Sequence, residues 1–193
     1  MQNYIRTINA VTGVVINSRQ VTTPFLVSDI PGCSDITGNV GITGTPVIDP
    51  ATDIAYFFAK SYKSDFRKPG ATGKENGVYY FYAVDVNTLQ DVPGFPILVD
   101  GNFAQNDPRR YFIGGIALQR PSLTQIGSVV YAGFGSHCDF YNYTGYIMGV
   151  DVKKAQVITL FSTQGKDGPF SADLDNGKSG DSGIWMSGVC SPL

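Results

Sequence analysis

Residues 54–59 read Ile-Ala-Tyr-Phe-Phe-Ala, and residues 129–134 read Val-Val-Tyr-Ala-Gly-Phe. Their tyrosines, Tyr56 and Tyr131, lie 75 residues apart. Short runs this rich in aromatic and β-branched residues predict β-strands with both faces covered. Because the two runs occupy the same place in a longer pattern, they indicate an internal repeat. An internal repeat is the strongest sequence evidence for the fold, because it identifies a repeat architecture that local features alone would miss.

Other signals recur in the same order around these runs. A Gly-Ile pair opens an apolar segment three times, and an apolar residue followed by Asp or Asn ends a later strand three times. The Gly-Ile pairs are at 41–42, 115–116 and 183–184, and the strand ends are at 8–9, 84–85 and 150–151. Each unit therefore predicts four short antiparallel strands, as in a propeller blade. A β-sandwich also has short strands, but it has no reason to repeat this four-strand signature.

The predicted fold class is all-β: an incomplete β-propeller of four-stranded antiparallel blades, with about two full blades and parts of two more. The end of one blade falls at 3–25, full blades at 41–100 and 114–163, and the first strand of the next at 183–193. A closed ring needs about four to eight blades. The expected partners are therefore the remaining blades of a longer chain or other copies of this one.

Composition narrows the function classes. The 193 residues include 42% hydrophobic but only 16% charged residues, with 14 basic against 16 acidic side chains. No broad positive field is expected, which argues against nucleic acid as a partner. No apolar run of about 18 residues predicts a membrane span. The first residues lack the order of a secretory signal, so a signal, if the protein is exported, would lie upstream.

Several segments resemble those of secreted PQQ-like (quinoprotein-type) β-propeller repeat proteins, in the same order along nearly the whole chain. They include Gly-Ser-His-Cys-Asp at 135–139 and Gly-Ile-Trp-Met-Ser-Gly at 183–188, with further pieces at 29–36, 41–50 and 117–120. The resemblance implies a longer parent protein, an extracellular location and, in cofactor-dependent relatives, pyrroloquinoline quinone (PQQ) with calcium. The tryptophan of their blade-docking motif is missing from the corresponding turns at 9–13, 85–89 and 151–155.

The connections fall into two classes. Short turns are expected on one face of the disc and long loops on the other, and long loops in a compact domain are commonly functional. The long loops span 26–40, 61–77, 100–113, 135–145 and 164–182. The candidate ligand-binding residues on or beside them are Asp35, Arg110, Arg120, His137, Asp139 and Trp185.

Each candidate also has a structural interpretation. His137 and Asp139 would hydrogen-bond loop backbone, and Arg120, if buried, would pair with Asp139 or Asp35. One histidine beside one cysteine falls short of a metal site, so none is predicted. The three cysteines are either small buried apolar residues or include a disulfide, for which Cys33 and Cys138 are the candidates. Asn142 begins a glycosylation sequon.

These observations favour a non-catalytic extracellular scaffold or binding module whose long-loop face holds a small molecule, a glycan or a protein. The alternative is part of a PQQ-dependent alcohol or sugar oxidoreductase, in which this chain would supply at most part of the cofactor site.

Overall fold

The computed structural model describes residues 2–34, 36–69, 73–108, 110–138, 143–163 and 182–186. The regular secondary structure within them is almost entirely β-strand, which confirms the all-β prediction. The strands are β1 (Tyr4–Ile8), β2 (Val15–Gln20), β3 (Phe25–Leu26), β4 (Asn39–Val40), β5 (Val47–Asp49), β6 (Ile54–Tyr62), β7 (Gly77–Asp85), β8 (Ile97–Leu98), β9 (Ala117–Leu118), β10 (Thr124–Ile126), β11 (Val129–Ser136), β12 (Tyr146–Asp151) and β13 (Gln156–Ser162). Three short helical turns are η1 (Val27–Asp29), η2 (Lys63–Asp65) and α1 (Gly73–Asn76).

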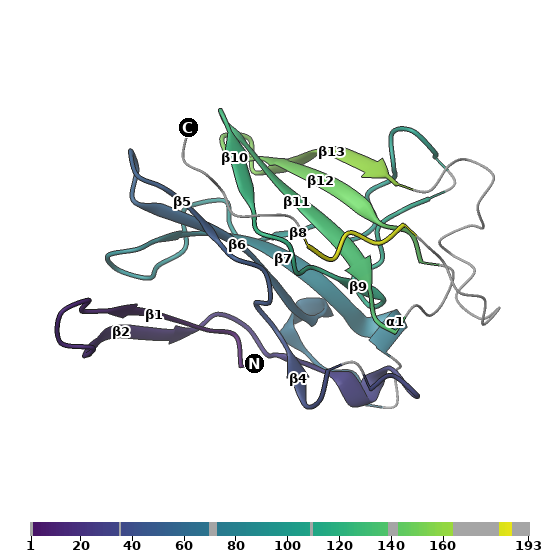
Figure 1. Cartoon of the computed structure of the whole chain (residues 1–193), viewed down its shortest axis with the longest axis horizontal. Helices are drawn as coiled ribbons and strands as arrows, with labels where there is room; N and C mark the ends of the chain where they lie inside the picture. The colour runs from purple at the N-terminus through teal and green to yellow at the C-terminus, as the bar shows by residue number, and fades with distance from the viewer. Residues whose placement is uncertain are drawn as a thin grey trace.

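Two up-and-down antiparallel sheets dominate the structure (Figure 1). One has the order β5-β6-β7-β8, and the other has the order β10-β11-β12-β13 with the short β9 paired to the far end of β11. The smaller β1–β2 and β3–β4 pairs complete the fold. The described residues form no closed ring, so the propeller and its blade count stay a prediction.

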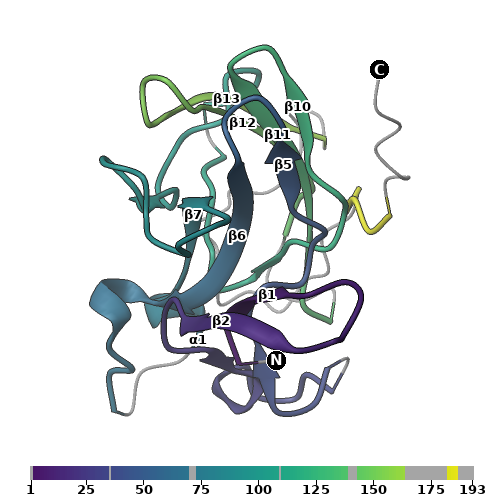
Figure 2. The same ribbon diagram turned by 90° about the vertical axis from the view of Figure 1, so that its left-hand side faces the viewer.

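The sheets stack as layers. Alternate residues of β6 and β7, including Phe58 and Phe81, share one core cluster with Phe134 and Met148 of the β10–β13 sheet. The opposite side chains of β6 and β7, including Phe57, form a second cluster against the β1–β2 hairpin. Figures 1 and 2 both show the hairpin and the β10–β13 sheet on opposite sides of the β5–β8 sheet. Both faces of that sheet are therefore covered, which explains why β6 and β7 are apolar throughout.

The three short turns that begin at Asn9, Asp85 and Asp151 share one hydrogen-bonding pattern. An Asn or Asp side chain accepts backbone N–H groups two or three residues ahead, as in an Asx-turn. Asn9 binds the N–H groups of residues 11 and 12, Asp85 those of 87 and 88, and Asp151 those of 153 and 154. The recurrence of this turn explains the apolar-Asp or apolar-Asn pair that marks each repeat.

Candidate functional site

The long loops contact one another at the end of the sheets away from these turns. A disulfide joins Cys33 in the 26–40 loop to Cys138 after β11. Arg67 in the 61–77 loop donates two hydrogen bonds to Asp29, at 2.6 and 2.8 Å. This ion pair holds the pKa of the Asp29 carboxyl below its ordinary value. The contacts tie loops from different repeats into one surface.

A groove of about 310 Å³ opens on this surface between the 61–77 and 100–113 loops. Its polar lining consists of Lys63, Glu75, Asp100 and Tyr111, and its apolar lining includes Val78, Leu98, Phe112 and Ile113. Lys63 and Glu75 are exposed, whereas Asp100 and Tyr111 are half-buried. An apolar floor with a few convergent polar groups is the usual form of a small-molecule site.

Asp100 is the most perturbed group in the groove. Its Oδ2 accepts the backbone N–H of Tyr79 at 2.9 Å, and its Oδ1 accepts that of Gly114. Burial nevertheless raises the pKa of this carboxyl to about 7, because the charged form loses its water. Asp100 thus links β7 to the following loop, and it can present either a charged or a neutral carboxyl near neutral pH.

Lys60 lies in the core beside this surface, in the middle of the apolar strand β6. Its side chain is fully buried, and its amine donates hydrogen bonds to the carbonyls of Gly115 and Ala117, at 3.1 and 2.8 Å. Burial lowers the pKa of the amine well below its ordinary value. A neutral amine has two N–H bonds, which matches these two acceptors.

We expect Lys60→Met to remove a pH dependence of stability. Because the folded-state pKa of Lys60 is depressed, the unfolded chain binds a proton that the folded chain does not, so the free energy of unfolding rises with pH. Urea unfolding between about pH 8 and 9.5, above the pKa of Asp100 and below those of the tyrosines, should show this slope in the wild type and lose it in Lys60→Met. The exposed Lys153→Met is the control, and equal slopes in all three proteins would contradict the assignment.

His137 is buried, with its ring 6.3 Å from that of Phe25. Its backbone N–H donates to the Ile116 carbonyl, but neither ring nitrogen has a hydrogen-bond partner in the described structure. Burial lowers the pKa of the imidazole to about 2, so it is neutral under ordinary conditions. His137 therefore belongs to the core under the long loops and does not reach the groove.

The two candidate arginines lie in opposite environments. Arg110 is fully buried, and its nearest described carboxylate oxygen, Asp107 Oδ2, is 3.4 Å from Nε. Arg120 follows β9 and is exposed, so the condition for its expected ion pair with Asp139 or Asp35, burial of the arginine, is not met. Neither arginine lines the groove.

Trp185 is half-buried and packs over Gly135, where an added Cβ would lie 3.0 Å from the indole ring. It joins the apolar cluster of Phe25, Tyr62 and Leu118, which Cys33 also contacts. Trp185, His137 and the disulfide are thus brought close to one cluster. The candidates Asp35, Asp139 and Asn142 lie outside the described residues.

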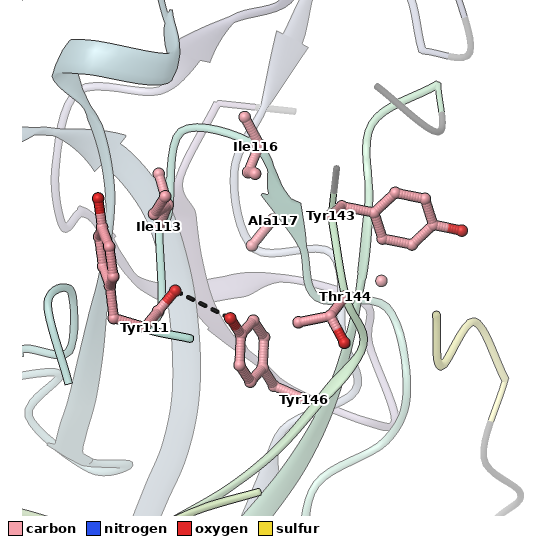
Figure 3. A pocket seen from close by; sticks show the side chains of 8 residues that line it. Tyr111, Ile113, Ile116, Ala117, Tyr143, Thr144 and Tyr146 are labelled. Atoms are coloured by element: carbon pink, nitrogen blue, oxygen red, sulfur yellow. Dashed lines mark hydrogen bonds between the residues drawn. The ribbon is translucent and has the colours of Figure 1, made fainter. Parts of the chain in front are cut away.

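A second, enclosed cavity lies between Tyr111 and Tyr143 (Figure 3). Ile113, Ile116, Ala117 and Thr144 also line it, and the Tyr146 hydroxyl donates to the Tyr111 carbonyl at 2.9 Å beside it. Its volume of about 10 Å³ is close to that of one water probe. This cavity is too small for a ligand. A third opening, of about 410 Å³, is lined by Gln2, Asn3, Tyr4, Arg6 and Ile42, none of which belongs to the long loops. The groove is therefore the candidate site of the long-loop face.

The described residues show neither a cluster of metal-ligating side chains nor a helix long enough to span a membrane. The six described stretches contain no group of three or more His, Cys, Asp or Glu side chains placed to hold a metal ion. Their helical turns are all too short to cross a bilayer. The leading interpretation of the sequence includes no cofactor, and PQQ with calcium belongs only to the alternative oxidoreductase interpretation; neither is tested by these residues.

Comparison of the chain with protein-family models, with curated proteins and with solved structures finds no match. The resemblance to PQQ-like repeat proteins therefore also stays a prediction, and the geometry of the site carries the functional argument.

Lys63, Glu75, Asp100 and Tyr111 were not among the site residues predicted from the sequence. One feature of the sequence could have pointed to these four residues: they lie in or beside the loops 61–77 and 100–113, which were both predicted on the long-loop face. Asp100 also directly follows an apolar strand. Without coordinates, nothing indicated which residues of two loops 23 or more positions apart would meet.

Proposed function

We propose that the chain is a non-catalytic binding module whose long-loop face holds a small hydroxylated molecule, such as a sugar unit of a glycan. The groove lined by Lys63, Glu75, Asp100 and Tyr111 is the observation that carries this proposal. A loop face built on rigid strands is where binding sites are commonly found.

The chemistry of the lining fits hydroxyl groups. A hydroxyl both donates and accepts hydrogen bonds, so it can donate to Glu75 or Asp100 and accept from Lys63 or Tyr111. Each oxygen of Asp100 accepts one backbone N–H and keeps a lone pair for a ligand. Acidic and basic groups together suit a neutral polar ligand better than a strongly charged one.

An aromatic surface adjoins the groove. The ring of Phe103, which is 63% exposed, lies 5.7 Å from that of Tyr111. Aromatic faces bury the apolar C–H faces of sugar rings while polar groups at the rim bind the hydroxyls. Phe103 would therefore extend the binding surface beyond the groove.

An extracellular location is part of the proposal. The Cys33–Cys138 disulfide is compatible with it, because disulfides persist in oxidising compartments and are rare in the cytosol.

Saturation-transfer NMR with glucose, mannose, galactose and N-acetylglucosamine tests the proposal. We expect at least one sugar to bind, and Lys63→Met and Glu75→Gln each to weaken its binding about tenfold, because each removes a charge-assisted hydrogen bond of about 1.5 kcal/mol or more. Phe103→Ala should also weaken it.

Lys153→Met is the matched control, because Lys153 is exposed in a short turn at the opposite end of the sheets. It should bind like the wild type. Binding of none of the four sugars would refute the ligand class, and binding that is lost in Lys153→Met but kept in Lys63→Met would refute the site.

A further inference from the structure

Among the described residues, no further sheet packs on the apolar face at one end of the stack. On the β10–β13 sheet, the side chains that point away from the β5–β8 sheet include Ile126, Tyr131, Ile147 and Phe161. Three of them are well exposed: Ile126 at 66%, Ile147 at 40% and Phe161 at 46%. Of residues 182–186, Ile184 lies against Gly133 on this face.

The internal repeat shows what covers the equivalent face. At the repeat spacing of 75 residues, Tyr131 corresponds to Tyr56 and Gly133 corresponds to Phe58. Gly133 is paired with Ile147 on the next strand, as Phe58 is paired with Phe81. Ile147 therefore corresponds to Phe81. In the β5–β8 sheet, Tyr56 and Phe81 stack with ring centroids 6.0 Å apart and are buried by the β10–β13 sheet. The exposed face of the β10–β13 sheet is therefore equivalent to the face of the β5–β8 sheet that the β10–β13 sheet covers.

The other end of the stack exposes the complementary surface. Ile8 is the repeat equivalent of Val84 and Val150, because each of the three directly precedes the Asn or Asp that begins a turn. Val84 and Val150 are both buried, each on the side of its sheet that faces the preceding layer. In the hairpin no described layer precedes, and Tyr4, Arg6 and Ile8 on that side are exposed, with the Arg6 guanidinium 5.0 Å from the centre of the Tyr4 ring.

We propose that a second copy of this chain docks head to tail, with its hairpin face around Tyr4 and Ile8 against the face around Tyr131, Ile147 and Phe161. The chain carries both halves of a layer-on-layer interface that it already forms twice internally. Contact between two different faces is heterologous, so it continues until it closes a ring or grows as a filament. This assembly does not depend on the proposed sugar groove.

Light scattering after size-exclusion chromatography over a concentration series tests the assembly. We expect the wild type to associate, and Ile8→Asp and Ile147→Asp each to bring the same concentration to monomer, with at least about 100-fold weaker association, because each buries an unpaired charge in the contact. Mixing these two variants should restore association but stop at a dimer, since only one intact pair of faces remains.

Val11→Asp is the matched control, because Val11 is 94% exposed at the tip of the same hairpin. Tyr4→Asp with Phe161→Asp repeats the mixing test at two further exposed positions, and circular dichroism confirms that each variant is folded. A wild type that stays monomeric at every concentration overturns the proposal. A mixture that stays monomeric while the wild type associates also overturns it, because the intact hairpin face of Ile147→Asp would then not bind the intact sheet face of Ile8→Asp. Association of either variant alone overturns it too, because a face that binds its own kind survives a substitution on the other face.

Discussion

Replacing both Cys33 and Cys138 with serine is expected to lower the free energy of unfolding by about 4 kcal/mol. The disulfide spans 105 positions of sequence, and in the chain-entropy description a loop of about 100 residues gives about 4.7 kcal/mol through the unfolded state. It joins the loop after β3 to the end of β11, beside the apolar cluster around Phe25 and Leu118. Urea unfolding of the variant and the wild type under non-reducing conditions measures the difference.

Reduction provides the internal control for this result. Wild type treated with a thiol reductant should unfold at the same urea concentration as the double serine variant, and the variant should not respond to the reductant. A variant within about 1 kcal/mol of the oxidised wild type would mean that the cross-link constrains the unfolded chain far less than its length predicts.

Phe134→Ala is expected to lower the free energy of unfolding by about 3–5 kcal/mol, the usual range for a fully buried phenylalanine. The Phe134 ring is fully buried and lies 5.2 Å from Phe58, 5.6 Å from Tyr79 and 4.8 Å from Phe112. These rings belong to both large sheets and to the loop between them, so the cavity would open in the middle of the core. Thermal and urea unfolding measure the loss.

Phe66→Ala is the matched control for the core variant, because Phe66 is 64% exposed. It should change stability by less than about 0.5 kcal/mol, as surface substitutions usually do. Similar losses in both variants would show that Phe134 does not hold the layers together.

The sequence predicted the strands well where both faces are covered. The aromatic runs at 54–59, 78–84 and 129–134 all lie within strands, because continuous apolar runs of this length bounded by turn residues favour β-structure. The repeat also predicted which turns would be alike, since Asn9, Asp85 and Asp151 each organise a turn through backbone N–H groups. Local chemistry determined these elements, so local sequence was enough.

The candidate site was much harder to predict. Arg110 and Arg120 looked alike in sequence, yet one is buried and the other exposed, because burial depends on which loop covers each position. Lys60 interrupts an apolar strand and gave no sign that two distant carbonyls would receive its amine. Asp100 and Glu75 line one groove because two separate loops fold toward each other. Such long-range contacts have no periodic signature.

The Asx-turns also bear on the order in which the protein folds. Each lets its two strands meet through contacts a few residues apart, and hairpins of this kind form within about 1–10 μs. The disulfide and the loop contacts join residues far apart in the chain, and their closure entropy must be overcome before any contact is gained. The turn end of the molecule is therefore expected to nucleate early, while the binding surface takes shape last, after the scaffold that supports it has formed.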